Sequence, residues 1–143
     1  MNTVETVERE SHVMESERIV HLPLGLLGFE RIKHYALIEN PHEAPFRWLQ
    51  VLDNPGLAFL LLPVTEFFPD YEPDVSAEDI AFLKISTPDD AWLFGIVTLG
   101  GKNRGTVNLK GPIVINRHSF VAKQVVLANA ARYSLQEPLP VGH

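Results

Sequence analysis

The sequence contains no cysteine among its 143 residues. Disulfide bonds, thiolate nucleophiles and cysteine-ligated zinc or iron–sulfur centres are therefore excluded. A chain of this length can bury a core without such cross-links, and its 45% of hydrophobic residues is typical of a folded globular domain. Because the absence of cysteine also fits a reducing compartment, we expect a cytoplasmic protein.

Long hydrophobic runs are also missing. The longest apolar stretch, residues 57–64, is far shorter than the roughly 20 residues that a membrane-spanning helix needs. The acidic segment 1–17 has no apolar core after a basic start, which is unlike a secretory signal. We expect a single domain over residues 1–143 that does not contact a membrane, with loose ends at about 1–10 and 137–143.

The chain has no motif for catalysis or for cofactor binding. It contains no glycine-rich phosphate loop and no Gly-x-Ser-x-Gly elbow, and its six histidines form no His-x-x-x-His pattern. We therefore expect no enzymatic activity, no cofactor and no metal ion. A hydrolase or isomerase that uses the carboxylates crowded in residues 66–79 is a minor alternative, because that segment offers no nucleophile and no metal motif.

Charge is distributed unevenly along the chain, whose formal net charge is −6. Residues 66–79 include acidic residues but no lysine or arginine, whereas residues 102–132 include basic residues but no aspartate or glutamate. The two segments are either ordinary solvated faces or the halves of a dipolar binding surface. The negative net charge disfavours nucleic-acid binding. A small barrel that binds nucleic acid through residues 102–132 is nevertheless the alternative function.

Short β-like segments separated by turn signals run through most of the sequence. An antiparallel pair is expected around the turn Asp53-Asn54-Pro55-Gly56, and Ser76 is placed to cap a short helix. Residues 63–74 contain three prolines and predict a loop. We expect a mostly β fold, a small antiparallel β-barrel or sandwich of about eight short strands with one short helix. The expected strands are 17–22, 34–39, 46–52, 57–62, 92–99, 106–110, 112–116 and 119–128.

Three aromatic residues lie in the acidic, proline-rich segment, where aromatic side chains are less expected. Phe67, Phe68 and Tyr71 either fold back beneath the loop or anchor a protein interface. Together with the neighbouring carboxylates they are candidate partner-binding residues. The candidates in this segment are Phe67, Phe68, Asp70, Tyr71, Glu72 and Asp74.

Four stretches of the sequence together resemble the FliW family of flagellar assembly factors. The most specific is Thr-Val-Asn-Leu-Lys-Gly-Pro-Ile-Val-Ile-Asn at 106–116, which adds Asn108 and Lys110 to the candidate partner-binding residues. The stretches occur in the family's order across nearly the whole chain. They are 19–30, 45–50, 58–59 followed by 70–71, and 106–116 followed by 123–127.

The resemblance implies a small cytoplasmic β domain with two protein partners, flagellin and the translational repressor CsrA. Abundant flagellin would occupy the protein and leave CsrA to silence flagellin mRNA, and export of flagellin would free the protein to antagonise CsrA. An acidic partner beside the RNA-binding surface of CsrA would lower its positive potential and repel phosphates. We therefore expect residues 66–79 to form the CsrA-docking face, with no direct contact to nucleic acid.

Overall fold

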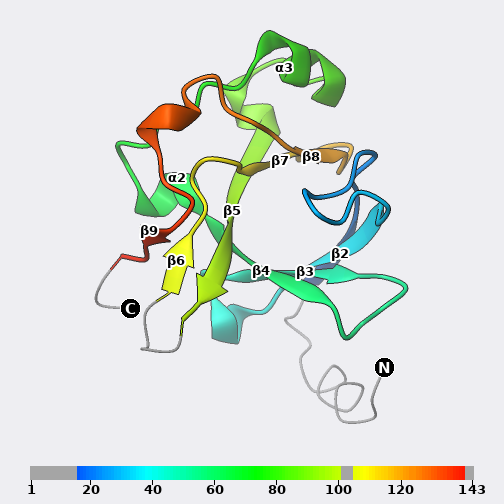
Figure 1. The fold of residues 1–143 in the computed structure, drawn as a ribbon. Coiled ribbons are helices and arrows are strands. Elements are labelled where there is room, and N and C mark those ends of the chain that lie inside the picture. Colours follow the sequence, from blue (N-terminus) through cyan, green and yellow to red (C-terminus); the bar gives the residue numbers. More distant parts are fainter. Residues whose placement is uncertain (1–15, 101–104, 141–143) are drawn as a thin grey trace.

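The computed structural model describes residues 16–100 and 105–140 (Figure 1). Their strands form one nine-stranded antiparallel sheet, so the prediction of a mostly β domain is confirmed. The strands are β1 (Ser16–His21), β2 (His34–Glu39), β3 (Arg47–Val51), β4 (Ala58–Pro63), β5 (Ala91–Leu99), β6 (Gly105–Val107), β7 (Ile113–Asn116), β8 (Ala122–Gln124) and β9 (Glu137–Pro138). The helices are α2 (Val64–Phe67), α3 (Ala77–Leu83) and the 3-10 turns η1 (Pro41–Glu43), η2 (Pro88–Asp90) and η3 (Ala130–Arg132).

Strand β5 is the branch point of the sheet. The strands follow the order β1-β2-β3-β4-β5-β6-β9, and β7 and β8 continue from β5. Phe94 lies opposite both Pro63 of β4 and Ile113 of β7, so β4 and β7 occupy opposite edges of β5. The later part of the second edge pairs with β6, through Val97 and Val107. Strands β6 and β7 therefore share one edge of β5 and are separated by a loop at 108–112.

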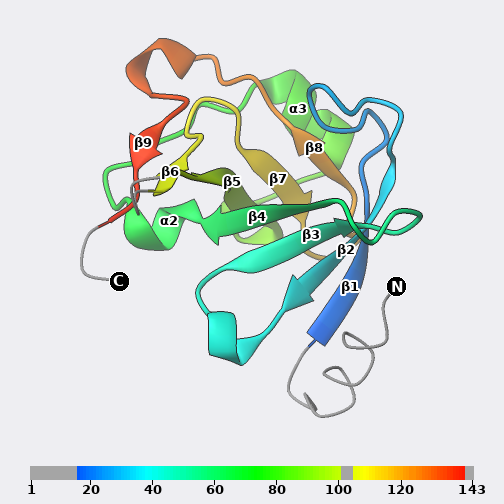
Figure 2. The same cartoon turned by 60° about the horizontal axis from the view of Figure 1, so that its bottom comes forward.

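The sheet curls until its two ends almost meet (Figure 2). The backbone amide of His21, at the end of β1, donates a hydrogen bond of 2.9 Å to the carbonyl of Phe120. An isolated parallel bridge also joins His21 to Val121, just before β8. Within the described residues no longer ladder connects β1 with β8. The sheet is thus strongly curled but is not a closed barrel.

Alternation of side chains along the strands produces two hydrophobic cores on the two faces of the curled sheet. In β5, for example, Phe94 points into one core and Val97 into the other. The inner core comprises Val20, Leu22, Leu26, Tyr35, Leu37, Leu49, Val51, Leu61, Phe94, Ile113, Ile115 and Ala122. The outer core comprises Leu62, Val64, Tyr71, Leu83, Val97, Val107, Leu109, Val114, Val125 and Leu127.

The expected helix after Ser76 is confirmed as α3. The Ser76 hydroxyl accepts a hydrogen bond of 3.1 Å from the backbone amide of Asp79, which satisfies one of the amides left open at the helix start. The expected loop at 63–74 is corrected, because it begins with α2. Val64, the first residue of α2, is fully buried in the outer core, and this burial holds the short helix in place.

Two predicted strands are shorter than expected by two residues or more at one or both ends. The strand predicted at 119–128 contains only β8, since Phe120 has a φ of +60° and turns the chain before the strand begins. The strand predicted at 106–110 stops after Val107, because the side chain of Asn108 binds the next backbone amides and replaces the ladder.

The C-terminal segment was expected to be loose from residue 137. The structure corrects this for β9, in which Glu137 lies opposite Val107 of β6. The backbone amide of Leu139 then donates to the carbonyl of Gly105 at 3.0 Å, and the Leu139 side chain packs against the outer core. Residues 1–10 and 141–143, the remaining parts of the predicted loose ends, lie outside the described residues.

Candidate functional site

The segment between α2 and α3 lies along the C-terminal part of the chain (Figure 1). Asn129 joins these two segments through its side chain. Its amide nitrogen donates to the carbonyl of Glu72 at 2.9 Å, and its side-chain oxygen accepts from the backbone amide of Asp74 at 2.9 Å. The backbone amide of Ala128 also donates to the carbonyl of Asp74. The acidic segment is therefore held in a defined shape by backbone contacts, and its carboxylates do not take part in them.

Tyr71 is the anchor of this segment within the fold. Its ring is buried in the outer core and packs edge-on against Tyr133, with ring centroids 4.8 Å apart. The Tyr71 hydroxyl donates a hydrogen bond of 2.7 Å to the carbonyl of Leu109. Burial raises the pKa of Tyr71, and the neighbouring Tyr133 adds to this effect. Tyr71 thus stabilises the acidic segment from within the outer core, and its side chain is not exposed on the surface.

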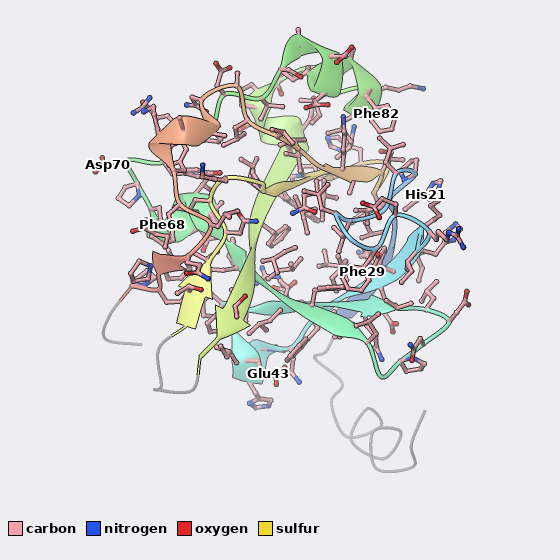
Figure 3. All side chains as sticks on the ribbon, in the orientation of Figure 1. His21, Phe29, Glu43, Phe68, Asp70 and Phe82 are labelled. Atoms are coloured by element: carbon pink, nitrogen blue, oxygen red, sulfur yellow. The ribbon has the colours of Figure 1, made fainter. Side chains whose placement is uncertain are left out.

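The other two aromatic candidates have intermediate positions. Phe67, at the end of α2, and Phe68, which follows it, are both half-buried and pack against the outer core. Figure 3 places Phe68 and Asp70 at one edge of the molecule, away from Phe82 and His21 at the opposite edge. The structure therefore brings Phe67 and Phe68 to the same region as the acidic candidates, with part of each ring open to solvent.

Five exposed carboxylates lie within residues 66–79, and we call them the acidic strip. Within the part of the chain that the structure describes, no lysine, arginine or histidine side chain forms a salt bridge with any of them. Their charges are consequently available to an approaching partner. The acidic strip consists of Glu66, Asp70, Glu72, Asp74 and Glu78.

Asp79, the sixth acidic residue of the segment, has a structural role instead. It is almost fully buried at the first turn of α3, and its carboxylate forms a salt bridge with the ammonium group of Lys123 from β8. The same ammonium group lies 5.5 Å from the ring centre of Phe82. This contact fixes α3 against the sheet, and it removes both Asp79 and Lys123 from the set of free charges.

Asn108 shapes the loop that separates β6 from β7. Its side-chain oxygen accepts hydrogen bonds of 2.9 Å and 3.0 Å from the backbone amides of Lys110 and Gly111. The side-chain amide of Gln124 closes the same loop by donating to the carbonyl of Gly111 at 3.0 Å. Asn108 is therefore engaged inside its own loop, whereas the side chain of Lys110 is half-exposed beside it.

Three basic residues of the predicted alternative make separate contacts within the described part of the chain. Lys123 is paired with Asp79, Arg117 lies 5.7 Å from the ring centre of Trp92, and Arg132 lies 5.7 Å from that of Tyr133. Lys123 thus contacts α3, and Arg117 lies against Trp92 near the start of β5. Arg132 lies against Tyr133, whose hydroxyl bonds to the backbone of Glu72 in the acidic strip. Lys102 and Arg104 fall outside the described residues.

Sequence reasoning found the acidic strip from charge alone but missed the residues that hold it. Asn129 and Tyr133 contact a segment more than 50 positions earlier in the chain, at sequence separations of 55 to 61. Nothing in local spacing could have indicated these contacts. The resemblance of residues 123–127 to a family motif indicated only that this part of the chain matters.

Comparison with known proteins decides the family. The model of the family described as FliW protein matches residues 3–139. This chain belongs to the FliW family. The match spans the acidic strip, the loop at 108–112 and every strand of the sheet.

Individual relatives agree with this assignment. The flagellar assembly factor FliW of Natranaerobius thermophilus is 34% identical over 128 residues, which cover 88% of this chain and 84% of that protein. The FliW protein of Leptospira biflexa is 39% identical over 115 residues, with 79% of this chain and 75% of that protein covered. A crystal structure of the flagellar assembly factor FliW superposes with a TM-score of 0.75 at 34% identity, covering 85% of each chain.

Two further observations bear on the class of this FliW-family protein. None of the helices in the described ranges is long and apolar enough to cross a membrane. Residues 16–100 and 105–140 also contain no group of three or more histidine, aspartate or glutamate side chains arranged to hold a metal ion.

Proposed function

We propose that this protein binds flagellin in the cytoplasm and antagonises the translational repressor CsrA, so that flagellin synthesis is coupled to flagellin export. Membership of the FliW family is the observation that carries this proposal. The protein acts by binding, without catalysis. It contacts proteins and leaves RNA to CsrA.

The acidic strip supports the CsrA half of the proposal. A protein that holds RNA must present basic side chains to the phosphates, and these side chains attract a surface of opposite charge. The strip offers Asp70, Glu72 and Asp74 at alternate positions of the sequence, all exposed, on a backbone fixed by Asn129. Because the backbone is already ordered, little conformational entropy is lost when a partner docks.

Antagonism follows from the charges that the docked strip brings. Carboxylates placed beside the RNA-binding surface of CsrA reduce its positive potential, and RNA phosphates are then repelled. The effect needs proximity, because the Debye length in physiological salt is only about 8 Å. The acidic strip therefore docks at or next to the RNA-binding surface.

Isothermal titration of purified CsrA tests the docking face. The triple variant D70N/E72Q/D74N removes three charges from the strip with little change in side-chain size. We expect it to bind CsrA at least about tenfold more weakly than the parent protein at low salt, and we expect the difference to shrink at high salt as the charges are screened.

A matched control separates the strip from general charge effects. The variant E17Q/E43Q/D53N removes the same number of charges from exposed positions elsewhere, and Figure 3 shows Glu43 far from Asp70. We expect this control to bind CsrA as the parent protein does. Equal affinities of the parent protein and the strip variant, at both salt concentrations, would exclude the acidic strip as the docking face.

The flagellin half of the proposal is tested by co-purification from cytoplasmic extract, followed by mass spectrometry of the bound proteins. We expect flagellin in cells whose flagellin export is blocked, and CsrA in cells that make no flagellin. If neither protein is recovered in either strain, the proposed function is wrong.

A further inference from the structure

The inner core of the curled sheet ends in a layer of different chemistry. Successive inward side chains lie two positions apart on each strand. One layer is entirely apolar and consists of Val20, Leu37, Leu49, Leu61, Phe94 and Ile115. The next positions toward the open end line a pocket, and three of them, Arg18, Glu39 and Arg117, are exposed. The six residues are Arg18, Glu39, Arg47, Pro63, Trp92 and Arg117. The apolar interior is thus followed at this end by three arginines, a glutamate, a proline and a tryptophan.

This end of the interior contains a cavity of about 590 Å³, which we call the mouth pocket. Its floor is apolar, with Leu37 and Phe94, and Arg18 and Arg117 stand at its side with Trp92. The volume lies in the range of small-molecule and peptide sites, which are typically apolar clefts with a few well-placed polar groups. None of the eight candidate partner-binding residues lines it, although Glu66 of the acidic strip and Arg117 of the predicted basic half do.

Aromatic rings hold two of the arginines of the mouth pocket. The guanidinium carbon of Arg117 lies 5.7 Å from the ring centre of Trp92, and that of Arg18 lies 6.0 Å from the ring centre of Phe120. The two rings pack edge to face with their centres 5.7 Å apart. Contact with a ring face leaves the N–H groups at the edge of a guanidinium free to donate in its own plane.

The carboxylates around the mouth pocket do not neutralise these two arginines. Glu39 is paired with Arg47 at 3.1 Å. Among the described residues, no carboxylate lies within salt-bridge distance of Arg18 or Arg117, although Arg117 donates to the backbone carbonyl of Asp89 at 3.3 Å. Glu66 and Asp89 are exposed at the rim, where their charges oppose the entry of a polyanion such as RNA.

From this arrangement we propose that the mouth pocket binds a carboxylate carried on an apolar group. The carboxylate pairs with the guanidinium groups of Arg18 and Arg117, and the apolar group enters toward Leu37 and Phe94. Arginine forks match carboxylate geometry, and such charge-assisted hydrogen bonds are about twice as strong as neutral ones. A protein C-terminus that ends in an apolar residue and a free organic acid both carry this chemistry.

The indole N–H signal of Trp92 in two-dimensional NMR reports binding directly, because Trp92 lines the mouth pocket and Trp48 does not. The probes are N-acetyl-leucine and N-acetyl-leucinamide, which differ only in the charged group. We expect a saturable shift of the Trp92 signal with the acid and at least about tenfold weaker binding of the amide. No shift with the acid, or equal affinity for acid and amide, would overturn the proposal.

Substitution then separates the arginines from general effects of charge. R117Q should weaken binding of the acid at least about tenfold and leave binding of the amide unchanged, because a neutral side chain no longer pairs with the carboxylate. The control R31Q removes the same charge from an exposed loop residue outside the pocket and should change neither affinity. R18Q gives a second variant at the same site if R117Q does not fold. Equal acid affinities of R31Q and a folded pocket variant would contradict the assignment.

The source of the carboxylate is resolved by a third probe, a pentapeptide that ends in leucine with a free C-terminus. If the peptide binds at least about tenfold more tightly than N-acetyl-leucine, backbone contacts contribute and a protein C-terminus is the ligand. If the two bind equally, the pocket recognises the free acid. Both results require the discrimination between acid and amide, and a peptide amide that binds as well as the peptide acid would overturn the proposal.

Discussion

The hydroxyl of Tyr71 donates a hydrogen bond to the carbonyl of Leu109, a residue 38 positions later in the chain. The bond joins the acidic segment to the loop between β6 and β7, and both of its partners are buried. Tyr71→Phe removes the donor and leaves the Leu109 carbonyl unsatisfied. We expect the free energy of unfolding to fall by about 1–3 kcal/mol, measured by urea denaturation.

Tyr35 is a matched case with the opposite expectation. It is fully buried in the inner core, and its hydroxyl has no hydrogen-bond partner among the described residues. Burial also raises the pKa of Tyr35, as expected for a phenol removed from water. Because Tyr35→Phe removes a polar group that gains nothing in the fold, we expect the free energy of unfolding to stay the same or rise by about 1 kcal/mol.

The two Tyr→Phe variants check each other, because they make the same chemical change at two buried sites. Urea denaturation of both proteins under identical conditions gives the comparison. A larger loss of stability in Tyr35→Phe than in Tyr71→Phe would contradict both assignments.

Gly25 and Gly28 both have positive φ angles, of 68° and 88°, in the loop after β1. At Gly25 an added Cβ would lie 2.5 Å from the carbonyl oxygen of Phe29 and 2.6 Å from the Cα of Glu30, whereas at Gly28 it would meet nothing within 4 Å. We expect Gly25→Ala to destabilise by more than about 2 kcal/mol, since backbone must move. Gly28→Ala should cost only about 1 kcal/mol, the ordinary penalty of the left-handed conformation. Thermal denaturation of the two variants measures this difference, and equal losses would show that the tight contact at Gly25 is absent.

Asp90 makes the free energy of unfolding depend on pH. Its carboxylate accepts hydrogen bonds of 3.0 Å from the backbone amides of Thr87 and Ser86 and lies 3.0 Å from the ring nitrogen of His118. The two amides, first Thr87 and then Ser86, followed by His118, lower the pKa of Asp90 below its ordinary value of 3.8. A lowered pKa in the fold stabilises the protein above the unfolded-state pKa, and this contribution is lost as the pH falls through the folded-state pKa.

The measurement compares H118Q with H118Q/D90N, so that Asp90 alone changes charge. We expect the difference in free energy of unfolding between the two proteins to be constant above about pH 5 and to decrease as the pH falls below about 4. A difference that is independent of pH down to about pH 2 would contradict the role of the Thr87 and Ser86 amides.

Alternation and turn chemistry were sufficient to predict most of the sheet. The turn at 53–56 joins β3 and β4 as an antiparallel pair, and Ser76 caps α3. The missed element was α2, because its short run carries no periodic signal and depends on the burial of Val64. Strand β9 was also missed, since its two residues, one of them a proline, are stabilised only by the edge of β6 that they meet.

The candidate site was predictable only in its charge. Sequence composition showed where the carboxylates are concentrated along the chain. It could not decide whether the Tyr71 side chain is buried in the core or exposed on the surface, because its burial depends on contacts with Leu109 and Tyr133. It also gave no sign of the mouth pocket. Trp92 and Arg117 are brought together by the pairing of β5 with β7, and the curl of the sheet adds Arg18 from β1.

The position of strand β5 also determines whether an N-terminal fragment of the chain could fold by itself. Its side chains contribute to both hydrophobic cores, and its second edge is completed by residues that come later than position 104. A fragment that stops before this position would leave that edge unpaired and would lack three of the twelve inner-core residues and five of the ten outer-core residues. We therefore expect the domain to fold cooperatively only after nearly the whole polypeptide has been synthesised, once β6 and β7 have emerged from the ribosome.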